Sequence, residues 1–188
     1  VAIHGDLAAA SSASGIVTVL ERDSESATWS VSQTVTAPEG AGGFGAAVAL
    51  SDDLLLVGAP GSDGLDDTDV GSAFLYALAD VSEPLLELGA ETPIAREQLG
   101  GAVAIGEDFI ALSAPGSNPG FGGNGTVAGR VLTFSRETGE ELDEFSANEG
   151  SLDDYFGVKI GVSGRDLIAS VVEEVPVLGA QASRWFRR

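Results

Sequence analysis

Apolar and polar residues alternate over short stretches along the whole chain, and no stretch keeps the 3.6-residue period of an amphipathic helix. The short apolar runs are rich in β-branched and aromatic residues, and Gly, Asp, Ser and Pro separate them as turn residues. The pattern predicts an all-β protein. The expected strands are 15–22, 29–35, 71–78, 83–90, 129–136, 140–147 and 180–187, together with two short strands before each Gly-rich loop.

The sequence repeats itself. Residues 44–60 (FGAAVALSDDLLLVGAP) align without a gap with residues 99–115 (LGGAVAIGEDFIALSAP), with seven identities in 17 positions. A third copy begins at Phe156 and is aligned with one extra residue in its turn, and residues 1–11 match the repeat from Val48 onward. The alignment makes four aspartates equivalent, namely Asp6, Asp53, Asp108 and Asp166.

Each repeat holds four short strands, which is typical of a propeller blade. Small residues fill the first strand, where blades converge on an axis, and the apolar run 54–57 predicts a central strand buried on both faces. We therefore expect a β-propeller of four-stranded antiparallel blades, with about 3.75 blades in this chain. The expected divisions are a partial blade in 1–42, blades in 43–98 and 99–155, and a partial blade in 156–188.

These motifs resemble the FG-GAP repeat of integrin α-chain β-propellers. Phe44-Gly45 and Gly58-Ala59-Pro60 carry the namesake residues, and the copy at Phe156 lacks the Gly-Ala-Pro. The resemblance implies a seven-bladed ring, of which this chain would be one part. It also implies an extracellular or cell-surface binding module that has no catalytic role.

Charge excludes several classes of partner. The chain has 29 Asp and Glu but only 9 Lys and Arg, for a net charge of −20, and it has no Cys. So acidic a chain cannot neutralise a phosphate backbone, which excludes nucleic acid as a partner. No apolar stretch is long enough for membrane insertion, and zinc fingers and disulfide scaffolds are excluded.

The loop 61–70 is the candidate metal site. It places Asp63, Asp66, Asp67 and Asp69 within seven residues, and such crowding is repulsive unless the groups are hydrated or share a cation. A hydrated loop and a non-standard Ca²⁺ site are both compatible with the pattern. The calcium loop that some family blades carry between strands one and two has no counterpart here, because those hairpins are too short and too poor in oxygen ligands.

Asn124 and His4 are the two other residues with a candidate chemical role. Asn124, in Asn124-Gly125-Thr126, is a glycosylation sequon in an expected surface loop. His4, the only histidine, aligns with turn positions and is expected to be an exposed turn residue. No G-x-S-x-G motif accompanies it, so a catalytic triad is not indicated.

The function predicted from the sequence is binding, for adhesion, recognition or assembly. In the family resembled, the loops from strand two to three and from strand four to the next blade share one rim, which carries recognition. Here these loops are 60–70, 115–128, 38–43, 91–98 and 147–155. The expected partner is a protein or glycan, or copies of the chain itself. Two alternatives stay open: a structural subunit of an extracellular filament or coat, and the non-catalytic propeller of a secreted hydrolase.

Overall fold

The computed structural model describes residues 1–64, 69–116, 129–146, 156–172 and 181–187. Every helix or strand found in these ranges is a β-strand, which confirms the all-β class. No helix in the described ranges has the length and apolar character needed to cross a membrane.

The strands form four antiparallel sheets that follow the chain order, three with four strands and the last with three. The first sheet contains β1 (Ala2–His4), β2 (Leu7–Ser11), β3 (Ile16–Arg22) and β4 (Trp29–Thr36). The second contains β5 (Ala47–Leu50), β6 (Leu54–Ala59), β7 (Ser72–Ala77) and β8 (Leu86–Leu88). The third contains β9 (Val103–Ile105), β10 (Phe109–Ala114), β11 (Arg130–Ser135) and β12 (Glu141–Ser146). The fourth contains β13 (Ile160–Ser163), β14 (Asp166–Val172) and β15 (Gln181–Arg187).

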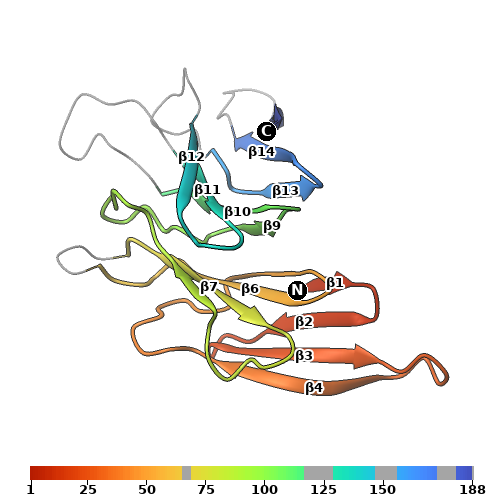
Figure 1. Cartoon of the computed structure of the whole chain (residues 1–188). Coiled ribbons are helices and arrows are strands. Elements are labelled where there is room, and N and C mark those ends of the chain that lie inside the picture. Colours follow the sequence, from red (N-terminus) through yellow and green to blue (C-terminus); the bar gives the residue numbers. More distant parts are fainter. Residues whose placement is uncertain (65–68, 117–128, 147–155, 173–180, 188) are drawn as a thin grey trace, which may run out of the picture.

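The sheets are stacked in sequence, with the first sheet at the bottom of Figure 1 and the fourth at the top. Their first strands meet in the same order, because β1 contacts β5, β5 contacts β9, and β9 contacts β13. Small residues such as Ala47, Ala49 and Ala104 on these strands allow the close approach. This is the convergence of blades on an axis that the repeat predicted.

Apolar side chains fill the space between successive sheets. Leu55, Val57 and Phe74 of the second sheet pack on Val17 and Val19 of the first. Leucines from the other face of the second sheet pack on the third, and the third packs on the fourth in the same way. Every residue of β6 and β10 is buried, so the central strands are covered on both faces, as predicted.

The Phe-Gly pair of each repeat closes one end of these cores. Phe44, Leu99 and Phe156 are each buried in a different one of the three cores. The glycine that follows Phe44 has a positive φ of 87°, which favours glycine, and its N–H donates to Gly58 O at 2.9 Å. The repeat motif therefore joins the entry of each blade to its second strand.

The hairpin of the fourth sheet corrects one detail of the sequence alignment. β13 and β14 pair Ser163 with Asp166 and Val162 with Leu167, so the turn is Gly164-Arg165. The second sheet pairs Leu50 with Leu55 in the same manner. The hairpins therefore have equal length, and no extra residue is needed. Arg165, rather than Asp166, stands at the position of Asp6, Asp53 and Asp108.

Candidate functional site

Three connecting segments meet at one end of the blades: residues 37–46, the described residues 60–64 and 69–71, and residues 89–102. We call this surface the loop rim. Gly61 N donates to Gly42 O at 2.9 Å, which joins the first two segments. Gln98 N donates to Asp69 O and Leu99 N donates to Val70 O, both at 3.0 Å, which joins the second to the third. Three of the five expected recognition loops, 38–43, 60–70 and 91–98, are therefore in direct contact through their described residues.

A cavity of about 270 Å³ opens where these segments meet. Phe74, Val70 and Pro93 supply its apolar surface, and Ser62 and Ser72 contribute two buried hydroxyls. Ser72 Oγ donates to Ser62 Oγ at 2.8 Å, so these hydroxyls satisfy one another. At about 270 Å³ the cavity lies just below the range of about 300–1,000 Å³ that is usual for sites of whole small molecules, and it has ample room for one long side chain.

The polar lining of this rim pocket is acidic. Glu39 comes from the segment between the first two sheets, Asp63 from the loop between β6 and β7, and Glu87 from β8. No Lys or Arg is among the described residues that line it. Three carboxylates beside an apolar wall suit a group that carries a positive charge on an apolar stem.

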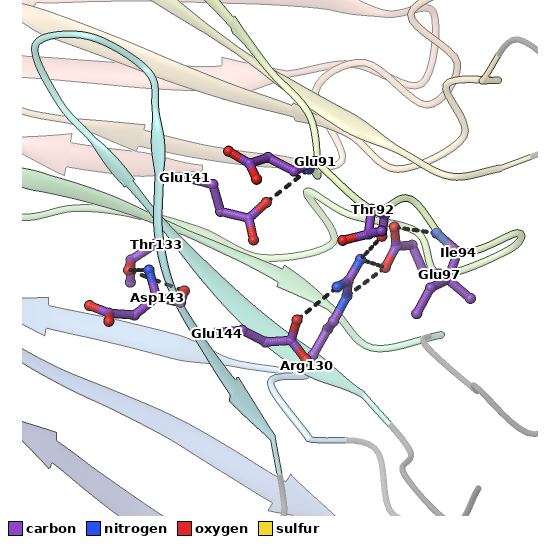
Figure 2. A network of polar contacts seen from close by, with 9 residues as sticks. All are labelled: Glu91, Thr92, Ile94, Glu97, Arg130, Thr133, Glu141, Asp143 and Glu144. Atoms are coloured by element: carbon purple, nitrogen blue, oxygen red, sulfur yellow. Dashed lines mark hydrogen bonds and ion pairs between the residues drawn. The ribbon is translucent and has the colours of Figure 1, made fainter.

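Beside the pocket, a buried arginine fastens the segment 89–102 to the third sheet (Figure 2). The side chain of Arg130 is 5% exposed and that of Glu97 is fully buried. Arg130 Nε donates to Glu97 Oε2 at 2.8 Å, and its two terminal nitrogens donate to Glu144 Oε2 and Thr92 O, each at 2.9 Å. Glu97 Oε1 in turn accepts the Ile94 N–H at 2.9 Å. Charge-assisted hydrogen bonds therefore fix the loop in addition to the apolar packing of Leu99.

The pKa of Glu97 is raised above its ordinary value, chiefly because burial disfavours the charged form. The Ile94 N–H and the Arg130 guanidinium act in the opposite direction. Arg130 and Glu97 are not among the site residues predicted from the sequence. One signal was present: Arg130 opens an apolar strand at the position that Ser72 occupies in the preceding repeat, and a charge there requires a buried partner.

Backbone strain is concentrated at the same rim. Four non-glycine residues in the described ranges have positive φ, and three of them, Asp69, Arg96 and Gln98, lie where the loops meet. Such conformations persist only where the surroundings impose them, and they cluster at ligand-binding sites. The side chain of Arg96 is exposed there.

The structure describes only two of the four aspartates predicted as a metal site, and it does not describe the predicted glycosylation site. Asp63 Oδ1 accepts the Asp69 N–H at 3.0 Å, so these two lie together and close the loop. Asp66 and Asp67 lie outside the described residues, as does Asn124. Among the residues that are described, no three His, Cys, Asp or Glu side chains form a group suited to a metal. The calcium site and the glycosylation site stay predictions.

The opposite end of the blades, which we call the hairpin rim, has a different character. His4 is exposed, as expected for a turn residue, and its Nε2 lies 2.8 Å from Asp52 Oδ1 in the next blade. Asp53 pairs with Arg136 of the third sheet, and Asp108 pairs with Arg165 of the fourth. A hollow of about 440 Å³ lies here, but Arg136 already neutralises part of its acidic lining. The hairpin rim therefore serves to join blades.

The antiparallel sheets stack in order with their first strands in contact, which defines part of a β-propeller. In such folds, ligands bind to the loops at the ends of the blades. Residues 29–76 match the family model described as the FG-GAP repeat. The chain therefore carries an FG-GAP repeat, which spans β4 to β7. No curated protein matches the sequence. FG-GAP repeats build β-propeller modules that often serve adhesion or recognition, are typically non-catalytic, and typically lie in extracellular domains.

Proposed function

We propose that this chain is a non-catalytic, extracellular β-propeller module that binds a protein partner through the loop rim. The observation that carries the proposal is the rim pocket, where three segments bring Glu39, Asp63 and Glu87 around an apolar wall. An arginine or lysine side chain of the partner enters this pocket. Its charged end meets the carboxylates, and its methylene stem lies against Phe74 and Pro93.

Three features support binding in place of catalysis. The two buried hydroxyls of the pocket are hydrogen-bonded to one another. The loops are held in strained conformations by the Arg130 cluster, and such pre-organisation favours affinity. The net charge of −20 also steers a basic partner toward the molecule and speeds its association.

The proposal is tested with a fluorescent, end-blocked peptide that contains two arginines in a Gly-Ser background, measured by anisotropy. Glu87→Gln removes one pocket carboxylate and keeps its size, so we expect about tenfold weaker binding, consistent with the loss of a charge-assisted contact of ~1.4 kcal/mol. Glu25→Gln, which makes the same charge change in the exposed turn between β3 and β4, is the matched control and leaves affinity unchanged.

Two results would contradict the proposal. One is equal weakening by the two substitutions, because general attraction to an acidic surface would then explain the binding. The other is equal affinity for a peptide in which both arginines are replaced by glutamine. High salt is expected to weaken the binding, because Glu39, Asp63 and Glu87 are all exposed and their attraction for a cation is screened.

A further inference from the structure

A second cavity lies directly beside the rim pocket, between the outer strands of the first and second sheets. Its volume is about 400 Å³, and we call it the edge pocket. The two pockets share Phe74 and Glu87, which pair with each other across β7 and β8. These two residues form the boundary between the pockets, so a ligand that passes over them reaches both.

The chain lines the two pockets in one continuous order. On the first sheet, residues 34–38 line the edge pocket, and residues 39–40 continue into the rim pocket. On the second sheet, residues 81–84 line the edge pocket, Glu87 lines both, and residues 89–90 line the rim pocket. Because both walls progress in the same order, the pockets are successive parts of one groove.

β7 sets the distance between the two pockets. Ser72 and Phe74 line the rim pocket, whereas Phe74 and Tyr76 line the edge pocket. Alternate residues of a strand lie on one face, so the edge pocket is displaced from the rim pocket by two residues, or about 7 Å along the strand. Side chains two positions apart in an extended peptide have this same spacing and point in the same direction.

The edge pocket also includes the edge of a strand. Thr34, Val35 and Thr36 all line it, although successive side chains of a strand point to opposite faces, so the edge of β4 itself forms this wall. Among the described strands, β4 pairs only with β3. The outer N–H and C=O groups of β4 can therefore receive an extended chain.

The edge pocket is acidic and contains a hydroxyl that the protein does not satisfy. Glu83 and Glu87 line it, and its described lining includes no Lys or Arg. Tyr76 is only 2% exposed, and its hydroxyl makes no hydrogen bond within the described part of the chain. Since no enclosed side-chain oxygen or nitrogen in that part lacks a partner, the Tyr76 oxygen reaches the open space of the pocket.

These groups suit a second basic side chain. Burial, with the nearby Glu83 carboxylate in addition, raises the pKa of Tyr76 to about 12, so the hydroxyl is neutral at neutral pH and its oxygen can accept a hydrogen bond. A guanidinium or ammonium group donates to this oxygen and to the carboxylates, while Val81 and Pro84 supply an apolar wall for its stem.

We propose that the two pockets together bind an extended segment of the partner that carries two basic side chains in the pattern basic-x-basic. One side chain enters the rim pocket and the other enters the edge pocket, while the main chain between them lies along the edge of β4. The inference rests on the proposed function of the rim pocket, and it adds the spacing and the conformation of the partner segment.

Four fluorescent, end-blocked peptides in a Gly-Ser background test the spacing. Three contain two arginines, which are adjacent, separated by one serine or separated by a long Gly-Ser linker, and the fourth contains a single arginine. The first three have equal charge, so general attraction to the acidic chain is equal for them. Anisotropy gives the dissociation constants for the parent, for Glu83→Gln and Tyr76→Phe in the edge pocket, and for the control Glu25→Gln outside the groove.

We expect Arg-Ser-Arg to bind about tenfold more tightly than the other two-arginine peptides, as one further charge-assisted contact would give. Adjacent arginines point to opposite sides of an extended chain, and a long linker lowers the effective concentration of the second arginine. Glu83→Gln and Tyr76→Phe should each remove most of this preference, whereas Glu25→Gln keeps it. Both edge-pocket substitutions keep side-chain size, so neither is expected to lower the melting temperature.

Equal affinity for the three two-arginine peptides would overturn the inference, as would a preference that survives both edge-pocket substitutions. The single-arginine peptide tests the rim pocket separately, because Glu39 lines that pocket and not the edge pocket. If Glu39→Gln weakens its binding while the three spacings bind equally, the proposed function stands and only the shared groove is refuted. If Glu39→Gln has no effect, the rim pocket is refuted and this inference with it.

Discussion

At the scale of single residues, the feature with the largest energetic consequence is the ion pair of Arg130 and Glu97. Both side chains are buried, and each makes further hydrogen bonds, to Glu144 and Thr92 on one side and to the Ile94 N–H on the other. A buried ion pair of this kind stabilises the folded state little more than well-packed apolar residues would. Removing one partner is costly, however, because the other charge is then buried without a partner. Its role here is to position the loop beside the rim pocket.

Arg130→Ala is therefore expected to lower the free energy of unfolding by about 3–5 kcal/mol at neutral pH. Urea denaturation measures the loss. Arg136→Ala is the matched control, because Arg136 pairs with the exposed Asp53 and such surface pairs contribute at most about 1 kcal/mol. Equal losses in the two variants would show that Glu97 is not desolvated as described.

The effect of Arg130→Ala depends on pH in a defined direction. The pKa of Glu97 is raised above its ordinary value of 4.5, so the stability linked to this group is fully present below pH 4.5 and is lost as the pH rises through the folded-state pKa. Without Arg130 to favour the carboxylate, this loss grows at neutral pH. The loss of unfolding free energy caused by Arg130→Ala should therefore become smaller as the pH falls. A loss that stays constant with pH would contradict the raised pKa of Glu97.

At the scale of elements, the turns and loop crossings set the positions of the blades. Gly42 and Gly61 approach so closely that a Cβ on Gly42 would lie 2.0 Å from Gly61 O. The close approach allows the loop before β5 to hydrogen-bond to the loop after β6. Glycine is required here for space, in contrast with the positive φ that requires it at Gly45.

Gly42→Ala is expected to separate the two loops and to destabilise the protein by about 1–3 kcal/mol, as overpacking against backbone does. Gly161→Ala is the matched control, since a Cβ there meets nothing within 4 Å. Thermal unfolding of both variants measures the difference. The rim pocket is also expected to lose affinity for the arginine peptide in Gly42→Ala alone, and unchanged stability together with unchanged affinity would refute the loop crossing.

The turn between β3 and β4 offers an independent check by titration. Asp23 Oδ1 accepts hydrogen bonds from the Ser26 N–H at 2.6 Å and from the Glu25 N–H at 3.1 Å, and these bonds, led by the one from Ser26, lower the pKa of Asp23. The stability that it contributes is present above the ordinary value of 3.8 and is lost as the pH falls through the lowered pKa. An NMR titration should place this pKa below 3.8, and Asp23→Ala should speed amide exchange of Ser26; Glu25→Ala should not.

How far the sequence predicts the structure is clearest from particular elements. Strand positions and buried central strands follow from alternation and from the repeat, because these depend on local pattern. The hairpin of the fourth sheet was misaligned, because Asp166-Leu167 resembles Asp53-Leu54 although the register places Arg165 at the aspartate position. The Arg130 cluster and the rim pocket join residues from separate segments, and one sequence does not encode their proximity in any local pattern.

At the scale of the whole molecule, charge and shape act together. The two rims differ: the hairpin rim joins blades through exposed ion pairs, while the loop rim gathers carboxylates around a pocket. Exposed pairs weaken with salt, but so does the repulsion within a chain of net charge −20. Repulsion dominates, because few of the acidic residues have a basic partner available.

The melting temperature is therefore expected to rise as NaCl is increased from low concentration to about 0.5 M, where the screening length is only a few ångströms. Scanning calorimetry across the salt series measures it. Asp53→Asn provides the comparison, since it removes the pair with Arg136, whose weakening by salt opposes the rise, and the melting temperature of this variant should therefore rise more steeply with salt. A melting temperature that falls with salt would mean that the ion pairs of the hairpin rim outweigh the net repulsion.

The central claim is that the loop rim, and not the hairpin rim, is the recognition surface. Backbone amide NMR of the chain titrated with N-acetyl-arginine amide tests it most directly, with N-acetyl-glutamine amide as the neutral control. We expect the arginine probe alone to shift the amides of Gly40, Asp63, Gly71 and Ala90, which surround the pocket. Shifts confined to the hairpin rim around His4 and Asp52, or equal shifts with both probes, would contradict it.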